Sequence, residues 1–170
     1  MSGLTEVVFD RPEAVAGWLA IDDRVMGGVS SSRMRFDPAG HAVFEGMVSL
    51  DRGGGFASVR AAGLALGGPD TRGWRLESRG DGRRYRLALF VVDGFDAPSY
   101  QVEFEPPAGR WASIELPREA FEARLRGRAV PGAPPLEPAR VRQLGLLVGD
   151  RQEGPFSLAL RRIVRLDGPG

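Results

Sequence analysis

Turn-forming residues recur along the whole chain at short intervals, and this spacing limits the length of every secondary-structure element. The 24 glycines and 13 prolines of this 170-residue sequence are spread from one end to the other. They are therefore not gathered in a linker between domains. The segments between them are too short for the long helices of an α/β protein, and we expect many short strands.

Several of these segments alternate apolar and polar residues, which is typical of a strand with one buried face. Residues 41–50 and 100–104 follow this pattern, whereas residues 85–92 are apolar on both sides, which predicts a central strand. About ten such segments occur. Only residues 12–19 and 138–142 favour short helices. The sequence therefore predicts an all-β protein, a jelly-roll β-sandwich, with one domain over residues 1–170.

The order of strands and turns gives further expectations. Residues 51–55 look like the turn of a hairpin, and Gly80-Asp81-Gly82 forms the next tight turn. Residues 121–136 contain several glycines and prolines, and we expect an irregular loop there. The apolar alternation slips near Arg161-Arg162, which predicts a β-bulge.

Composition excludes several kinds of chemistry. The chain has no cysteine, and all 23 basic residues are arginine, so thiolate catalysis, disulfides and lysine Schiff bases are excluded. The single histidine, His41, cannot supply a histidine-rich metal site, and we expect it to be exposed beside a glycine turn. The Gly-x-Ser-x-Gly motif of serine hydrolases is missing. We therefore predict no catalytic residues, no cofactor and no metal.

Net charge and hydropathy limit the partners and the cellular location that we expect for the protein. A net charge of +1 leaves no strong field toward nucleic acid, so nucleic acid is not an expected partner. Residues 1–10 lack the pattern of a signal peptide, and no apolar run approaches the ~20 residues that a membrane helix needs. We expect a cytoplasmic protein without a membrane span.

Three glycine-rich runs stand out from the strand pattern: residues 21–32, residues 53–60 and residues 79–85. Glycine permits positive φ and close backbone approach, while Asp and Ser side chains hold turns by bonding to their own backbone. We expect the three runs to meet in space and form one binding surface. Its candidate residues are Asp22, Asp23, Arg24, Met26, Gly27, Gly28, Ser30, Phe56, Ser58, Arg60, Arg79, Asp81, Arg83 and Tyr85.

Each run also has a purely structural interpretation. Asp22 and Asp23 can bind a metal or act as acid and base, but catalytic carboxylates generally face each other across a cleft. We therefore favour a turn in which they cap backbone N–H groups. Gly27-Gly28 followed by serines can cradle phosphate, but the lysine and helix of a P-loop are missing. Arginines at several of these positions can bind an anion or pair with nearby carboxylates. Of the three tryptophans, we expect at least two in the core.

The sequence resembles the complex I intermediate-associated protein 30 family from about Trp18 to Ile163. The matching words are residues 22–30, Phe44-Glu45-Gly46, residues 54–60, residues 79–85, Trp111, Leu116-Pro117, Arg126-Gly127-Arg128 and Gly154-Pro155-Phe156. The resemblance implies a galactose-binding-domain-like β-sandwich and, as in mitochondrial members, a chaperone-like role in assembling respiratory complex I. The targeting extension of those members is missing here, so we expect a stand-alone bacterial form. The family brings no established catalytic residues, so its motif positions are carried over only as a candidate binding surface.

Three functional hypotheses follow. The first is a non-enzymatic assembly factor that binds a protein partner, with Met26 and Phe56 as apolar anchors and Arg60 and Arg83 as charged ones. The alternative is a carbohydrate- or small-ligand-binding module, which the galactose-binding-like fold also serves. An enzyme that uses one of the paired aspartates as a base is the least favoured.

Overall fold

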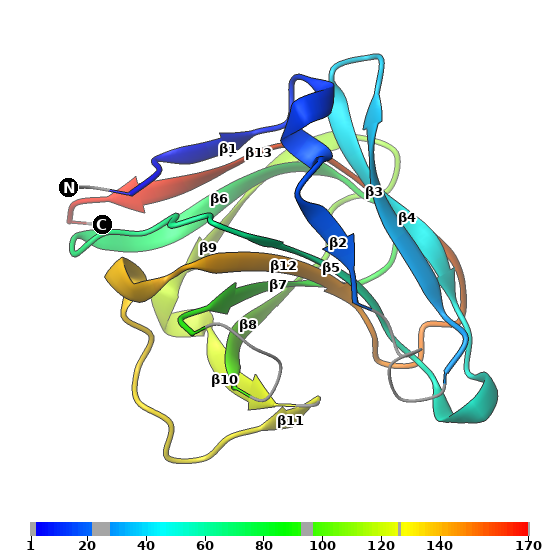
Figure 1. The fold of residues 1–170 in the computed structure, drawn as a ribbon. Helices are drawn as coiled ribbons and strands as arrows, with labels where there is room; N and C mark the ends of the chain where they lie inside the picture. The colour runs from blue at the N-terminus through cyan, green and yellow to red at the C-terminus, as the bar shows by residue number, and fades with distance from the viewer. Residues whose placement is uncertain (1–2, 22–27, 93–96, 126, 170) are drawn as a thin grey trace.

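Two antiparallel sheets packed face to face form the molecule (Figure 1). The computed structural model describes residues 3–21, 28–92, 97–125 and 127–169. The two-layer arrangement confirms the predicted jelly-roll β-sandwich. Within the described residues, no helix has the length and apolar character needed to cross a membrane.

The first sheet, sheet A, has the strand order β3-β4-β13-β6-β9, and β1 pairs with β13 as well. Its strands are β1 (Glu6–Val8), β3 (Ser31–Asp37), β4 (His41–Val48), β6 (Thr71–Arg79), β9 (Trp111–Pro117) and β13 (Gly154–Asp167). The first half of β13 pairs with β4 and the second half pairs with β6. The register on β6 shifts between Leu160 and Arg162, which confirms the predicted bulge.

The second sheet, sheet B, has the order β11-β10-β8-β7-β12-β5-β2. Its strands are β2 (Trp18–Ala20), β5 (Ala57–Ala62), β7 (Tyr85–Phe90), β8 (Ser99–Phe104), β10 (Glu122–Leu125), β11 (Arg128–Ala129) and β12 (Gln143–Val148). β7 lies between β8 and β12, which confirms its predicted central position. Short 3-10 turns are η1 (Pro12–Val15), η3 (Asp51–Gly53), η4 (Arg118–Ala120) and η5 (Pro138–Arg140).

The hairpin predicted at residues 51–55 is wrong. β4 belongs to sheet A and β5 to sheet B, so the turn η3 carries the chain from one layer to the other. Gly80-Asp81-Gly82 makes a second crossover of this kind, from β6 in sheet A to β7 in sheet B. Because β4 finds its partner in β13, more than a hundred residues later, local turn chemistry does not reveal the pairing.

Two further expectations need correction. The helix expected over residues 12–19 is only the 3-10 turn η1, because the chain then enters β2 and places Trp18 in the core. The loop expected over residues 121–136 contains β10 and β11, since β10 finds backbone partners on β8. The short helix expected over residues 138–142 appears as the 3-10 turn η5.

The core between the sheets is built from the alternating apolar residues. Phe44 and Phe156 of sheet A meet Tyr85 of sheet B, with ring centroids 4.9 Å apart for Phe44 and Phe156 and 6.2 Å apart for Phe44 and Tyr85. Trp74 is fully buried, and its indole N–H donates to the Leu66 carbonyl at 2.7 Å. Trp18 is also buried, so the prediction that at least two tryptophans lie in the core is confirmed.

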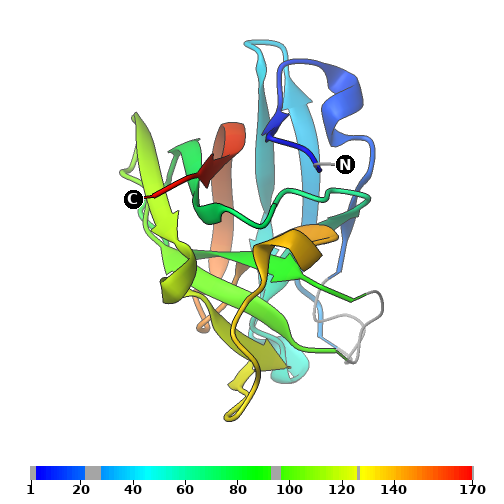
Figure 2. The same ribbon diagram turned by 90° about the vertical axis from the view of Figure 1, so that its left-hand side faces the viewer.

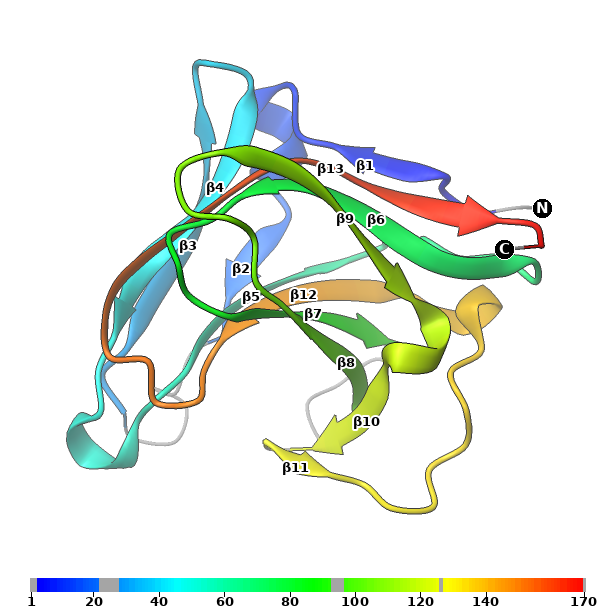
Figure 3. The ribbon, with the colours of Figure 1, turned by 180° about the vertical axis from the view of Figure 1, so that it is seen from behind.

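The sandwich has two distinct ends and a curved body. Figure 2 looks at the end that carries both chain termini. In Figure 3 the connections at residues 51–55, 80–84 and 149–153 lie at the opposite end. The strands of sheet B bend like an arch, and the face turned away from sheet A lies on the inside of the bend (Figure 3).

Candidate functional site

The residues that flank the first glycine-rich run are hydrogen-bonded to the second run. The backbone N–H of Ile21 donates to the Ser58 carbonyl at 2.8 Å, and the Ser58 hydroxyl donates back to the Ile21 carbonyl. The Ser32 hydroxyl donates to the same Ser58 carbonyl at 3.0 Å. The first two runs therefore meet where β2 and β3 approach β5.

Ser30 has a structural role at this junction. It is fully buried, its oxygen accepts a hydrogen bond from the Ser49 N–H at 2.9 Å, and its hydroxyl lies 3.3 Å from the Ser49 carbonyl. Gly28 is buried as well. Five predicted site residues lie outside the described residues: Asp22, Asp23, Arg24, Met26 and Gly27. Their binding role stays a prediction.

The third run is fastened to the start of β13. The Asp81 carboxylate accepts hydrogen bonds from the backbone N–H groups of Arg83 at 3.1 Å and Ser157 at 2.8 Å. The Arg83 guanidinium donates to the carbonyl oxygens of Glu153 at 3.0 Å and Pro155 at 3.2 Å. Charge-assisted bonds of this kind are stronger than neutral ones, so they hold the β12–β13 connection in place.

The β12–β13 connection joins the second and third runs. Phe56 lies beside Gly149, where a Cβ would be 3.7 Å from the Phe56 Cβ. The Gln152 amide bonds to the backbone of Arg84 through both its oxygen and its nitrogen, at 3.0 and 2.9 Å. We call this part of the molecule the glycine-loop end, defined as residues 28–32, 49–58, 80–84 and 149–157. All three runs reach it (Figure 3).

Three predicted site residues lie elsewhere. Tyr85 is fully buried between Phe44 and Phe104, and burial raises the pKa of its hydroxyl, so a role on an exposed surface is excluded. Arg60 and Arg79 lie on opposite outer faces of the sandwich, because β5 is in sheet B and β6 in sheet A. The single surface predicted from all three runs is therefore wrong for these residues.

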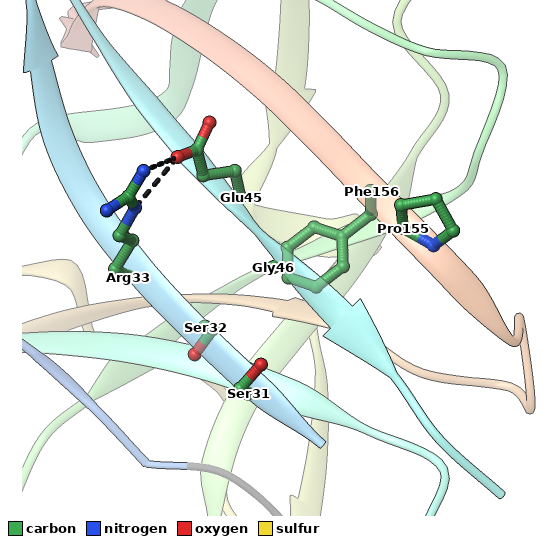
Figure 4. A pocket seen from close by; sticks show the side chains of 7 residues that line it. All are labelled: Ser31, Ser32, Arg33, Glu45, Gly46, Pro155 and Phe156. Atoms are coloured by element: carbon green, nitrogen blue, oxygen red, sulfur yellow. Dashed lines mark hydrogen bonds and ion pairs between the residues drawn. The ribbon is translucent and has the colours of Figure 1, made fainter.

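A shallow pocket of about 470 Å³ lies on sheet A at the glycine-loop end (Figure 4). The residues that line it are Ser31, Ser32, Arg33, Glu45, Gly46, Pro155 and Phe156. Met47 is 45% exposed, and Val29, two residues before Ser31, is 42% exposed. Met47 pairs in register with Ser31 on β3 and Pro155 on β13. We call Val29, Ser31, Arg33, Met47 and Pro155 the Met47 patch.

The carboxylate that lines this pocket, that of Glu45, is already paired with two arginines. Glu45 bonds to Arg33 through Oε2 at 2.6 Å and to Arg35 through Oε1 at 3.0 Å, and Figure 4 shows the Arg33 contact. Burial raises the pKa of Glu45, but the hydrogen bonds from the two guanidinium groups outweigh it, and the pKa lies below its ordinary value. Glu45 is therefore ionised at neutral pH and does not serve as a proton donor.

The outer face of sheet B carries a stacked pair. The Arg60 guanidinium lies 3.9 Å from the centre of the Phe90 ring. A Cβ on Gly145 would be only 3.0 Å from the edge of that ring, so glycine at this position leaves room for Phe90. Burial lowers the pKa of Arg60. Nearby, Arg86 pairs with Asp150 at 3.5 Å.

The outer face of sheet A holds a second cluster, centred on Trp111. The guanidinium carbons of Arg161 and Arg79 lie 4.0 and 5.1 Å from the ring centre, and the His41 ring meets it edge-on at 5.2 Å. His41 is only 6% exposed, so the expectation of an exposed histidine is wrong. The cause is tertiary packing, because Trp111 comes from the far edge strand of the sheet.

Among the described residues, no three Asp, Glu or His side chains gather as they would around a metal ion. The acidic side chains at the glycine-loop end, Asp81 and Glu45, bond to backbone N–H groups or to arginines. These contacts hold the backbone of the glycine-loop end and the strands of sheet A in place.

A sequence model of the family described as Complex I intermediate-associated protein 30 (CIA30) matches residues 7–160, which extend from β1 into β13. The chain belongs to this family. A relative in Schizosaccharomyces pombe, an uncharacterized protein, is 26% identical over 92% of this chain and 82% of its own length.

Solved structures with the same fold include carbohydrate-binding modules and an agarase. The family 11 carbohydrate-binding module of the cellulosomal cellulase Lic26A-Cel5E of Clostridium thermocellum aligns over 98% of this chain and 97% of its own, with a TM-score of 0.63 and 17% identity. An exo-beta-agarase aligns over 96% of this chain and 25% of its own, with a TM-score of 0.60 and 8% identity. At these identities the likeness concerns the fold, and this CIA30-family chain has the same β-sandwich.

The sequence pattern missed the residues that the Met47 patch exposes. The pattern predicts the binding surface at the glycine-rich runs, but in the structure their described side chains mostly bond to the backbone around the Met47 patch. A signal was present in β4, where Met47 falls on the polar side of an otherwise regular alternation. A contiguous exposed apolar patch marks a contact surface, so Met47 is informative only together with the residues around it.

Proposed function

We propose that this CIA30-family chain is a non-catalytic factor that binds a protein of a respiratory complex I assembly intermediate through the Met47 patch. The observation that supports this best is the exposure of Met47, in register between Ser31 and Pro155 at the glycine-loop end, together with the exposure of Val29, two residues before Ser31. Methionine and arginine are enriched at protein interfaces, and charged residues such as Glu are depleted at their centres. The patch contributes Met47 at its centre and Arg33 at its border.

The surroundings of the patch favour binding because they are fixed in advance. Ser30 ties the first run to Ser49, while Asp81 and Arg83 tie the third run to β13 on either side of Pro155. A surface that is already ordered loses less conformational entropy when a partner docks. The glycine-rich motifs of the family thus hold the contact residues in position.

The carbohydrate alternative has less support from the side chains. Sugar rings are usually held against an accessible aromatic face. Both tyrosines and two of the tryptophans, Trp18 and Trp74, are buried in the core, and the ring of Trp111 is covered by Arg161. On the inside of the arch, Phe90 is 7% exposed and stacked by Arg60. Titration with a broad glycan panel is expected to give no shift in melting temperature.

Affinity purification from the cells that encode this protein tests the proposal. Wild-type protein, Met47→Glu and the control Leu19→Glu are expressed with the same tag, and complex I subunits in the eluates are quantified by mass spectrometry. Leu19 is 66% exposed and pairs with Arg60 in sheet B, whereas Met47 belongs to sheet A. We expect Met47→Glu to lower subunit recovery roughly tenfold or more, as loss of a central contact does, while Leu19→Glu retains it. Equal recovery with all three proteins contradicts the proposal.

A further inference from the structure

The Trp111 cluster on the outer face of sheet A carries more positive charge than its surroundings neutralise. We define the cluster as His41, Arg79, Trp111 and Arg161. It lies at the other end of β4 from Met47, because His41 is the first residue of that strand. Across the sheet, Trp111 of β9 pairs with Arg79 of β6, and Arg79 pairs with Ala159 of β13.

The neighbouring carboxylates are already engaged with other arginines. Glu77, the next outward residue on β6, accepts a bond from Arg162 at 2.8 Å. Asp37 lies 3.3 Å from Arg35, and Glu45 lies 3.0 Å from the same guanidinium. In the part of the chain that the structure describes, the Arg79 and Arg161 side chains make no hydrogen bond or ion pair. Two guanidinium charges are therefore left without an anionic partner.

Packing on Trp111 does not replace such a partner. A cation–π contact at a partly exposed site contributes about 0.5–1 kcal/mol and leaves the N–H donors of the guanidinium unused. Each arginine presents five donors in a planar fork that matches the oxygens of phosphate or carboxylate. Arg79 is half-buried, so its donors also have less access to water.

The ring of His41 lies at the same place, in edge-on contact with Trp111. Its side chain is only 8% exposed, and its Nε2 atom has no hydrogen-bond partner, the nearest carboxylate oxygen being that of Asp37 at 3.9 Å. A buried polar atom without a partner costs free energy, and most such atoms in native proteins are paired. His41, Arg79 and Arg161 all contact the same Trp111 ring, which brings the three side chains together.

We propose that the Trp111 cluster is a binding site for a phosphate-class dianion, either inorganic phosphate or the phosphate group of a small ester. A dianion matches the two unpaired positive charges, and its tetrahedral oxygens accept bonds from both guanidinium forks, next to the ring of His41. A single carboxylate carries one charge and fills one fork, so it leaves the second arginine unsatisfied. This site is independent of the Met47 patch and of the proposed function.

The single histidine makes the test direct, because every imidazole NMR signal of the protein comes from His41. Wild-type protein is titrated with inorganic phosphate, glycerol phosphate and acetate at constant ionic strength, with chloride as the balancing salt. We expect a saturable shift of the His41 signal with the phosphates and no saturable shift with acetate. A tighter response to glycerol phosphate assigns the site to an ester, and a tighter response to inorganic phosphate assigns it to the free ion.

Substitutions of single arginines show which side chains bind the phosphate that shifts the His41 signal. Arg79→Gln and Arg161→Gln are each expected to weaken phosphate binding about tenfold or more, because a charged hydrogen-bond partner is lost. Arg118→Gln is the control: it removes an arginine that already pairs with Glu119, just beyond the end of β9 opposite Trp111, and it keeps the wild-type response. The proposal is overturned by a wild-type titration without saturation, by an acetate response equal to that of phosphate, or by unchanged binding in the Arg79 and Arg161 variants. The wild-type titration decides even where a variant does not fold.

Discussion

The carboxylate of Asp81 accepts a hydrogen bond from the backbone N–H of Ser157 at 2.8 Å, although Asp81 lies in the β6–β7 connection and Ser157 in β13. The same carboxylate accepts the Arg83 N–H at 3.1 Å. The third glycine-rich run is thereby joined to the start of β13, next to Pro155 of the Met47 patch. Asp81→Ala leaves both N–H groups without this acceptor.

We expect Asp81→Ala to lower the free energy of unfolding by about 1–3 kcal/mol, the usual effect of removing a charged hydrogen-bond acceptor. Urea unfolding followed by circular dichroism measures it. Asp10→Ala is the control, because Asp10 is exposed and contacts only the exposed Arg11. The control is expected to change stability by less than about 0.5 kcal/mol. An equal effect of the two substitutions contradicts the structural role of Asp81.

Gly46 is required where β3 and β4 approach each other. A Cβ at this position would fall on the Ser31 carbonyl oxygen and lie 2.8 Å from the Ser32 Cα. Gly46→Ala therefore has to separate the two strands, and we expect a loss of stability of at least about 1–3 kcal/mol. Gly17→Ala is the control, since nothing lies within 4 Å of a Cβ there. Thermal unfolding that ranks the two variants equally contradicts this explanation.

His41 makes stability depend on pH. Burial lowers the pKa of its imidazole from the ordinary 6.5; Asp37 raises this pKa, whereas Arg79 and Arg161 lower it further. The unfolded chain then binds the proton more readily than the folded one, so the free energy of unfolding falls as pH drops below about 6.5. The slope approaches at most about 1.4 kcal/mol per pH unit.

Urea unfolding between pH 7.5 and 5.5 measures this dependence in wild-type protein and in His41→Gln. We expect the variant to show a flatter pH profile than the wild type, whatever its absolute stability. Parallel profiles for the two proteins mean that another group titrates in this range, and they contradict the assignment to His41.

Local sequence patterns predict the strands well but say little about their partners. The alternation along β4 and β6 marks the buried face of each strand, because one face meets the core and the other meets solvent. The pairing of both strands with β13 depends on residues far away in the chain. A crossover such as η3 contains glycines just as a hairpin turn does. The residues of the turn therefore do not predict whether the next strand joins the same sheet or the other one.

In the candidate site, too, some features follow from the local sequence and others depend on tertiary structure. Turn chemistry and the family motifs led to the glycine-loop end, where Ser30, Asp81 and Arg83 fix the backbone. The burial of Tyr85 and the separation of Arg60 from Arg79 follow from sheet membership, which the sequence pattern does not contain. Met47 becomes a candidate only when β4 is seen next to β3 and β13.

Site-specific photo-crosslinking tests the central claim most directly. A photoreactive amino acid replaces Met47 in one protein and Leu19 in another, and both are irradiated in the cells that encode the chain. If the Met47 patch docks on a complex I assembly intermediate, the probe at position 47 crosslinks to a complex I subunit and the probe at position 19 does not. Crosslinks from position 19 alone, or the absence of any subunit crosslink from position 47, contradict the account.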